Sequence, residues 1–123
     1  MTIAEAISKV DALVPNTYAP EDKIRWLSAL DSRVKTQIID THQQTNPVYF
    51  YGYNGMMDTE TELLVKEPYD EMYLRWLEAQ IHYHNGEYGK YNNAIDMFNT
   101  TYEDYKRHYN RTHMPKGKQF KYF

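Results

Sequence analysis

Carboxylates and histidines are the residues of this sequence that could perform chemistry. One group of three carboxylates lies within the short segment of residues 58–62. Asp58, Glu60 and Glu62 have the alternating spacing that begins a calcium-binding loop. Position six of such a loop would be Leu63 instead of glycine, and position twelve would be Tyr69 instead of glutamate. The sequence therefore predicts a hydrophilic loop here and not a calcium site.

His82 and His84 are the only paired histidines of the sequence. On a helix, residues two apart point about 200° away from each other, so these imidazoles cannot share one metal ion. Glu78 and His82 do share a helix face, but no further ligand is placed to complete a zinc site. The absence of cysteine excludes disulfides, cysteine-bound metals and thiol nucleophiles. We therefore expect no enzymatic activity, no metal and no cofactor.

Tyrosine supplies much of the apolar surface of this chain. The 123 residues are enough for one domain, and they include 13 Tyr, 2 Trp and 6 Met. Because tyrosine combines a large apolar ring with a polar hydroxyl, it tolerates the half-hydrated surfaces of protein interfaces. The composition therefore favours a small private core together with surfaces that are shared with other subunits.

Charge is distributed unevenly along the chain. Residues 1–104 carry 17 acidic and 8 basic side chains, whereas residues 105–123 carry 6 basic and no acidic ones. This asymmetry suggests that the C-terminal segment has a partner of its own. A solvated segment that complements the C-terminus of a helix would show the same pattern. Charge alone leaves both interpretations open.

Hydrophobic periodicity predicts an all-α fold with about four helices. The first follows a capping box formed by Thr2 and Glu5 and stops before Pro15. The second begins at Pro20, because proline suits the first helical turn. Asn85-Gly86 separates the last two. The second predicted helix spans about residues 20–41, the third opens at residues 68–71 and ends at Asn85-Gly86, and the last runs from Tyr88 to between residues 110 and 113. The domain of residues 1–113 is followed by an extended basic and aromatic tail, residues 114–123.

The segment between the second and third predicted helices has no helical period. Residues 48–53 favour an extended backbone, and Tyr53-Asn54-Gly55 has the composition of a turn. Glycine and proline exclude a continuous helix. The sequence therefore predicts an excursion over residues 48–66 that is either a short β-hairpin or an irregular loop. A loop of this length in a small domain is usually functional or poorly ordered.

The last predicted helix carries the most regular pattern of the chain. Aromatic and apolar side chains recur along it at steps of three and four residues: Tyr88, Tyr91, Ile95, Phe98, Tyr102, Tyr105 and Tyr109. Such a stripe normally faces the core. A helix of about 23 residues is about 35 Å long, however, so its end could extend beyond the domain. In that case Tyr102, Tyr105 and Tyr109 would contact another subunit.

Five stretches spread over nearly the whole chain carry a resemblance to a known family: EDKIRWLSALD (21–31), IIDTH (38–42), LLVKEPYDEMY (63–73), NGEYGKYNNAI (85–95) and YNRTHMPKGKQFKYF (109–123). In order and wording they resemble the small head–tail connector (adaptor) proteins of long-tailed bacteriophages and prophages of Gram-positive bacteria. The resemblance implies a small helical protein without enzymatic activity. Its copies would assemble as a ring under the portal protein, usually with twelve-fold symmetry. Such rings extend the DNA exit channel and support stopper or tail-completion proteins.

The resemblance implies a role for two regions of the chain. The C-terminal segment of related connectors reaches toward the portal, so the tail is predicted to dock there through Lys116, Lys118, Phe120, Lys121, Tyr122 and Phe123. A loop between helices in related connectors faces the channel or the next ring. The matching loop here spans residues 49–62, and its candidate contact residues are Tyr49, Phe50, Tyr51 and Tyr53. Their aromatic density suits a protein contact better than a surface along which DNA slides.

A small helical nucleic-acid-binding or regulatory protein is the alternative function. The aromatic side chains of the basic tail could stack on bases. The body of the chain is acidic, however, and no DNA-reading helix is recognisable. No stretch approaches the ~20 apolar residues of a membrane span, so no membrane partner is expected. We expect a virion protein of the head–tail junction, assembled in the host cytoplasm, past which DNA moves without sequence-specific binding.

Overall fold

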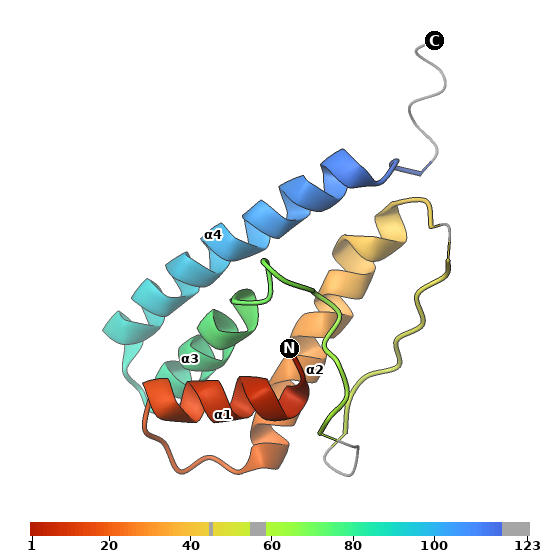
Figure 1. Cartoon of the computed structure of the whole chain (residues 1–123). Helices are drawn as coiled ribbons and strands as arrows, with labels where there is room; N and C mark the ends of the chain where they lie inside the picture. Colours follow the sequence, from red (N-terminus) through yellow and green to blue (C-terminus); the bar gives the residue numbers. More distant parts are fainter. Residues whose placement is uncertain (45, 55–58, 117–123) are drawn as a thin grey trace.

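Four α-helices follow one another in the computed structural model, which describes residues 1–44, 46–54 and 59–116 (Figure 1). They are α1 (Ile3–Leu13), α2 (Pro20–Gln37), α3 (Met72–His84) and α4 (Tyr88–Thr112), and the 3₁₀ turn η1 (Ile39–Thr41) follows α2. The predicted all-α class is therefore confirmed for the described residues.

The starts of α1 and α2 agree with the sequence signals. The Thr2 hydroxyl accepts a hydrogen bond from the Glu5 N–H at 3.1 Å, and the Glu5 carboxylate accepts one from the Thr2 N–H at 3.0 Å. This reciprocal capping box satisfies two backbone donors that the helix leaves free. Pro20 is the first residue of α2. The predicted end of this helix near residue 41 is wrong, because the chain tightens into the 3₁₀ geometry of η1 after Gln37.

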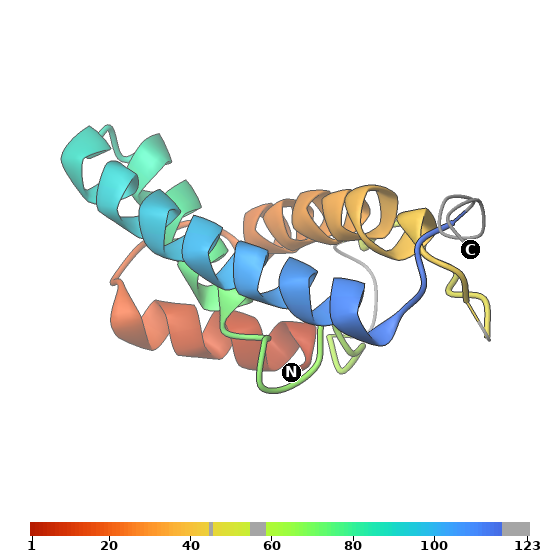
Figure 2. The same ribbon diagram turned by 90° about the horizontal axis from the view of Figure 1, so that it is seen from above.

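The helices α3 and α4 form an antiparallel pair (Figures 1 and 2). Gly86 joins them with a φ of +76°, a conformation that costs glycine little. The predicted start of α3 at residues 68–71 is too early. These residues form turns, in which the Tyr69 N–H donates to the Lys66 carbonyl at 3.0 Å and the Tyr73 N–H to the Asp70 carbonyl at 3.2 Å.

The central position of α3 explains where the core lies. Helix α3 contacts α1, α2 and α4, and α1 also contacts α2. The apolar side chains that face these contacts are fully buried, and the largest among them are Ile3, Leu27, Leu30, Met72, Tyr73, Leu77, Ile81 and Phe98. The core is therefore one continuous cluster of aliphatic and aromatic side chains drawn from all four helices.

The segment between η1 and α3 runs back along α2 and then returns toward α3 (Figure 1). We call residues 46–54 the outer arm and residues 59–68 the inner arm. The inner arm belongs to the core, since Leu63 and Val65 have no exposed surface. Its backbone also pairs with the start of α1: the Ile3 N–H donates to the Thr61 carbonyl, and the Leu63 N–H to the Met1 carbonyl, both at 3.0 Å.

Of the two predicted alternatives for this segment, the described residues of the arms do not form the β-hairpin. Neither arm contains a strand among its described residues, and the inner arm has only the isolated bridge between Thr2 and Glu62. The reason is that their backbone groups bind elsewhere: the Tyr53 N–H donates to the Ser28 hydroxyl of α2 at 3.0 Å. The segment is therefore an irregular loop. The turn predicted around Gly55 extends into residues outside the described ranges.

Candidate functional site

A buried carboxylate on α2 holds the two arms in place. Asp31 has no exposed surface and accepts three hydrogen bonds from described residues. The hydroxyls of Tyr53 and Tyr73 donate to it at 2.5 Å and 2.6 Å, and the Leu64 N–H donates at 3.1 Å. The Tyr73 hydroxyl itself accepts the Val65 N–H at 2.8 Å. One carboxylate thus joins α2, α3, the outer arm and the inner arm.

Burial governs the electrostatics of this cluster. It raises the pKa of the Asp31 carboxyl, because the charged form loses its hydration, and the hydrogen bonds from Tyr53, Tyr73 and Leu64 oppose the rise. Burial and the nearby charge of Asp31 also raise the pKa of Tyr53 and Tyr73. Both hydroxyls therefore keep their protons and act as donors. A carboxylate enclosed in this way has no access to a substrate, so its role is to position the loop.

Only an indirect signal for Asp31 can be found in the sequence. The stretch from Ile24 to Ile38 places either Leu30 or Asp31 on the apolar face of α2, and both residues are buried. An acidic residue next to a position of the apolar stripe could have identified a buried polar partner. Nothing in the local sequence identifies Tyr53, Leu64 and Tyr73 as its donors.

The outer arm presents aromatic side chains to solvent. Tyr49 is 73% exposed and Tyr51 is 92% exposed. Phe50 and Tyr53 are partly buried, and their rings meet edge to face with centroids 4.9 Å apart. Thr61, Glu62 and Leu64 of the inner arm complete a hollow of about 330 Å³ beside these residues. The four predicted contact residues therefore lie together, two of them exposed and two partly buried.

A second polar cluster fixes the point at which the C-terminal segment leaves α4. One ring nitrogen of His42, Nδ1, lies 2.7 Å from the Ile38 carbonyl, and the other, Nε2, lies 2.7 Å from the Asn110 side-chain oxygen. The amide of Gln44 donates to the Tyr109 hydroxyl at 2.8 Å. These contacts attach the chain after η1 to the last turn of α4.

Backbone pairing extends this attachment beyond α4. The Gln43 N–H donates to the Met114 carbonyl at 2.8 Å, and the Lys116 N–H donates to the Thr41 carbonyl at 3.0 Å. His42 and Pro115 form an antiparallel bridge between these two bonds. The tail predicted from residue 114 is therefore paired with the body as far as Lys116.

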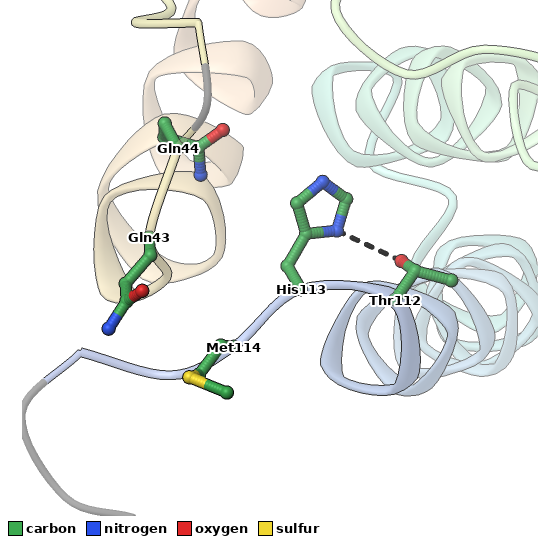
Figure 3. A pocket seen from close by; sticks show the side chains of 5 residues that line it. All are labelled: Gln43, Gln44, Thr112, His113 and Met114. Carbon is green, nitrogen blue, oxygen red and sulfur yellow. Dashed lines mark hydrogen bonds between the residues drawn. The ribbon is translucent and has the colours of Figure 1, made fainter.

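A hollow of about 250 Å³ lies beside this pairing (Figure 3). Five residues line it: Gln43, Gln44, Thr112, His113 and Met114. The His113 ring stacks on the Tyr109 ring with centroids 3.8 Å apart, and its Nδ1 lies 2.9 Å from the Thr112 hydroxyl oxygen. Met114 is 48% exposed, so the hollow offers an apolar side chain and amide groups to a partner.

The three tyrosines of the predicted subunit contact face the interior of the same chain. Tyr102, Tyr105 and Tyr109 are only 3%, 7% and 7% exposed. The Tyr102 hydroxyl donates to the Gln37 side chain of α2 at 2.9 Å, so the end of α4 packs on the domain instead of extending past it. The stripe is core from Phe98 onward, whereas Tyr88 at its start is 61% exposed. These three side chains lack the free surface that a subunit contact needs.

The predicted portal-binding residues are described only in part. Lys116 is exposed. Lys118, Phe120, Lys121, Tyr122 and Phe123 lie outside the described residues.

The histidine and acidic candidates do not assemble into a metal site. Among residues 1–44, 46–54 and 59–116, no three histidine or acidic side chains are placed to hold a metal ion. His82 instead lies 3.0 Å from the Glu87 carboxylate, and this contact, with Asn85 and Lys90, lowers the pKa of Glu87 to about 2. His84 stacks on Trp26 with centroids 5.0 Å apart. Asp58, in the predicted acidic loop, falls outside the described ranges.

Comparison with known proteins gives no match: no family model, no curated protein and no solved structure matches this chain. Within the described part of the chain, no helix is both long enough and apolar enough to cross a membrane. The candidate surfaces are therefore the outer arm and the C-terminal hollow, judged on their own geometry.

Proposed function

We propose that this protein is a structural head–tail connector of a long-tailed bacteriophage or prophage. Its copies would form a ring, of twelve subunits on a twelve-fold portal, that extends the DNA exit channel and supports a stopper or tail-completion protein. The protein would act at the head–tail junction of the virion without catalysing a reaction. DNA would pass through the ring without sequence-specific recognition.

The exposed tyrosines of the outer arm are the observation that carries this proposal. Exposed aromatic side chains are enriched at protein interfaces, where they contribute large contact areas at a low entropic cost. Tyr49 and Tyr51 are exposed, yet the arm that carries them is attached to α2 through Ser28 and Asp31. An aromatic surface on a fixed support is suited to assembly, since little order has to be gained on binding.

The tail supports the same proposal through its attachment. Because residues 114–116 pair with residues 41–43, the tail leaves the body at a fixed point. The proposed portal contact then begins at Lys116 and includes Lys118, Phe120, Lys121, Tyr122 and Phe123. Basic and aromatic side chains together fit an acidic surface that has apolar pockets.

A binding assay against the candidate portal tests this proposal. Full-length protein should bind the portal and form rings that are visible by negative-stain electron microscopy. A truncation after Lys116 should lose the binding while it keeps the pairing of residues 41–43 with residues 114–116. The matched control replaces Tyr49 and Tyr51 with alanine in the full-length chain, which should retain portal binding but lose contacts to the next protein of the tail.

The possible outcomes test the role of the tail separately from the connector function. Portal binding by the truncation would keep the connector function and remove the tail from the portal contact. If no form of the protein bound the portal and full-length protein bound DNA with a steep salt dependence, the nucleic-acid-binding function would replace the connector.

A further inference from the structure

Arg33 is an exposed residue of α2 whose side chain is held in place by two contacts. Its guanidinium carbon lies over the Tyr102 ring of α4, 4.7 Å from the ring centroid. Its Nε–H donates to the side-chain oxygen of Gln37 at 3.1 Å, and the Tyr102 hydroxyl donates to the same oxygen at 2.9 Å. The three side chains therefore form a closed group across α2 and α4, which we call the Arg33 cluster.

These contacts fix the orientation of the Gln37 side-chain amide. The Nε–H of an arginine can only donate a hydrogen bond, so the Gln37 atom that faces it must be the oxygen and not the nitrogen. The amide nitrogen of Gln37 therefore keeps its N–H groups for another acceptor. Within the described part of the chain, no acceptor lies within hydrogen-bond distance of that nitrogen.

The charge of Arg33 is also left without a partner. The other basic residues of α2 are each paired with a carboxylate: Lys23 with Asp11, Arg25 with Asp22 and Lys35 with Asp40. For Arg33, no carboxylate lies within ion-pair distance among the residues that the structure describes. Its terminal nitrogens are therefore available to an anion from outside the chain.

The charges around the Arg33 cluster favour such an anion. Burial raises the pKa of the Tyr102 hydroxyl, the Arg33 guanidinium opposes that rise, and the exposed Glu103 adds to it. The effect of Arg33 is larger than that of Glu103, so positive potential predominates at this hydroxyl. Glu103 weakens the attraction for an anion without cancelling it.

We infer that the Arg33 cluster binds a phosphate anion, free or as part of a phosphodiester, through the terminal nitrogens of Arg33 and the amide nitrogen of Gln37. A planar guanidinium matches two oxygens of such an anion in a bidentate pair. It would occupy both oxygens of a carboxylate, whereas a phosphate offers further oxygens to the Gln37 amide. Because Arg33 is already fixed, binding costs little side-chain entropy. The inference rests on these side chains alone and does not depend on the proposed connector function.

Titration of the full-length protein with sodium phosphate, followed by nitrogen–proton correlation NMR, tests this site. The Nε–H signal of Arg33 and the side-chain N–H signals of Gln37 should shift with phosphate, and sodium chloride at equal ionic strength should leave them in place. Sodium acetate should shift them only weakly, because it cannot engage both side chains. A short DNA duplex that shifts the same signals would identify a phosphodiester as the ligand, and shifts with phosphate alone would identify free phosphate.

Matched variants distinguish this site from a general attraction between charges. Arg33→Lys keeps the positive charge and loses the planar fork, so the affinity for phosphate should fall at least about fivefold. Gln37→Glu keeps an acceptor for Arg33 but loses the amide donors, and it should cause a similar loss. Arg25→Gln removes a charge of the same helix outside the cluster and should leave the affinity within about twofold. Glu103→Gln removes the opposing carboxylate and should strengthen binding.

The backbone amide signals of each variant, compared with those of the unchanged protein, show that its fold is kept. Absence of any phosphate-dependent shift at the Arg33 and Gln37 side chains would exclude the site. Equal shifts with acetate and phosphate would exclude its preference for phosphate. If Arg33→Lys bound as tightly as the unchanged protein, or if Arg25→Gln lost as much affinity as Arg33→Lys, net charge alone would attract the anion and the inference would be wrong.

Discussion

The outer arm and the inner arm are both extended, and neither contains a strand, yet they differ in what they contribute. The inner arm buries Leu63 and Val65 completely and pairs its backbone with the first residues of the chain. The outer arm leaves Tyr49 and Tyr51 in solvent and is held through Tyr53. Asp31 is the residue that both arms share. An irregular loop can thus be core along one half and binding surface along the other, when one buried acceptor fixes both halves.

Replacing Asp31, the hydrogen-bond acceptor that both arms share, should have the largest effect on the free energy of unfolding. Asp31→Ala leaves two tyrosine hydroxyls and one backbone N–H buried without an acceptor. We expect the free energy of unfolding to fall by at least about 3 kcal/mol, since each of the three unsatisfied buried groups costs about 1 to 3 kcal/mol. Urea denaturation followed by circular dichroism measures this loss. The control Asp96→Ala, on the exposed side of α4, should change stability by less than about 0.5 kcal/mol.

Because the inner arm contributes to the core, a substitution there should have the second-largest effect on the free energy of unfolding. Leu63→Ala removes a fully buried side chain and should lower the free energy of unfolding by about 3 kcal/mol, because the transfer energy and the remaining cavity both count. Leu13→Ala is the matched control, since Leu13 is 56% exposed on α1. Equal effects of the two substitutions in urea denaturation would contradict the assignment of the inner arm to the core.

The pH dependence of stability should reveal the buried carboxyl that joins the arms. Because the pKa of Asp31 is higher in the folded state than its ordinary value of 3.8, the folded protein binds this proton more tightly. The contribution of Asp31 to stability is therefore fully present below pH 3.8 and is lost as pH rises through the raised pKa, by up to about 1.4 kcal/mol per pH unit. The Asp31→Asn variant has no carboxyl group at this position and therefore lacks this pH-dependent contribution to stability. The stability of the unchanged protein minus that of Asp31→Asn should fall as pH increases, and parallel curves would argue against a raised pKa.

The hydrogen bond from the Tyr53 hydroxyl to Asp31, which holds the outer arm, should contribute less to stability than the whole Asp31 side chain. Tyr53→Phe removes one hydroxyl donor and keeps the ring, so we expect a loss of about 1 kcal/mol in the free energy of unfolding. Tyr49→Phe removes a hydroxyl from an exposed ring and serves as the control. Because Tyr53 lies on the outer arm, the loss should be accompanied by faster hydrogen exchange of the amides of residues 48–53.

The smallest effect on stability should come from the exposed face of the outer arm. Tyr51→Ala removes a side chain that is 92% exposed, so the free energy of unfolding should change by less than about 0.5 kcal/mol. The same substitution should weaken binding to the next protein of the assembly, which pull-down or surface plasmon resonance would detect. A large loss of stability without a loss of binding would show that Tyr51 is a structural residue. The outer arm would then belong to the core and not to a binding surface.

The local elements can be recognised from the sequence alone. The capping box of Thr2 and Glu5, Pro20 at the start of α2 and Gly86 between α3 and α4 act within a few residues, so their signals can be recognised from neighbours in the chain. The stripe on α4 also correctly identifies the buried residues from Phe98 to Tyr109. The aromatic outer arm could be recognised as a candidate surface because its composition is local.

The path of the loop and the partners of the buried acceptor depend on tertiary contacts. The donors to Asp31 stand 22, 33 and 42 residues away from it, and no periodicity connects them. The pairing of His42 with Pro115 is likewise distant in the sequence, and it places the hollow at the end of α4. Helices begin and end through contacts between neighbours, whereas a buried polar group needs partners that only the folded chain brings together.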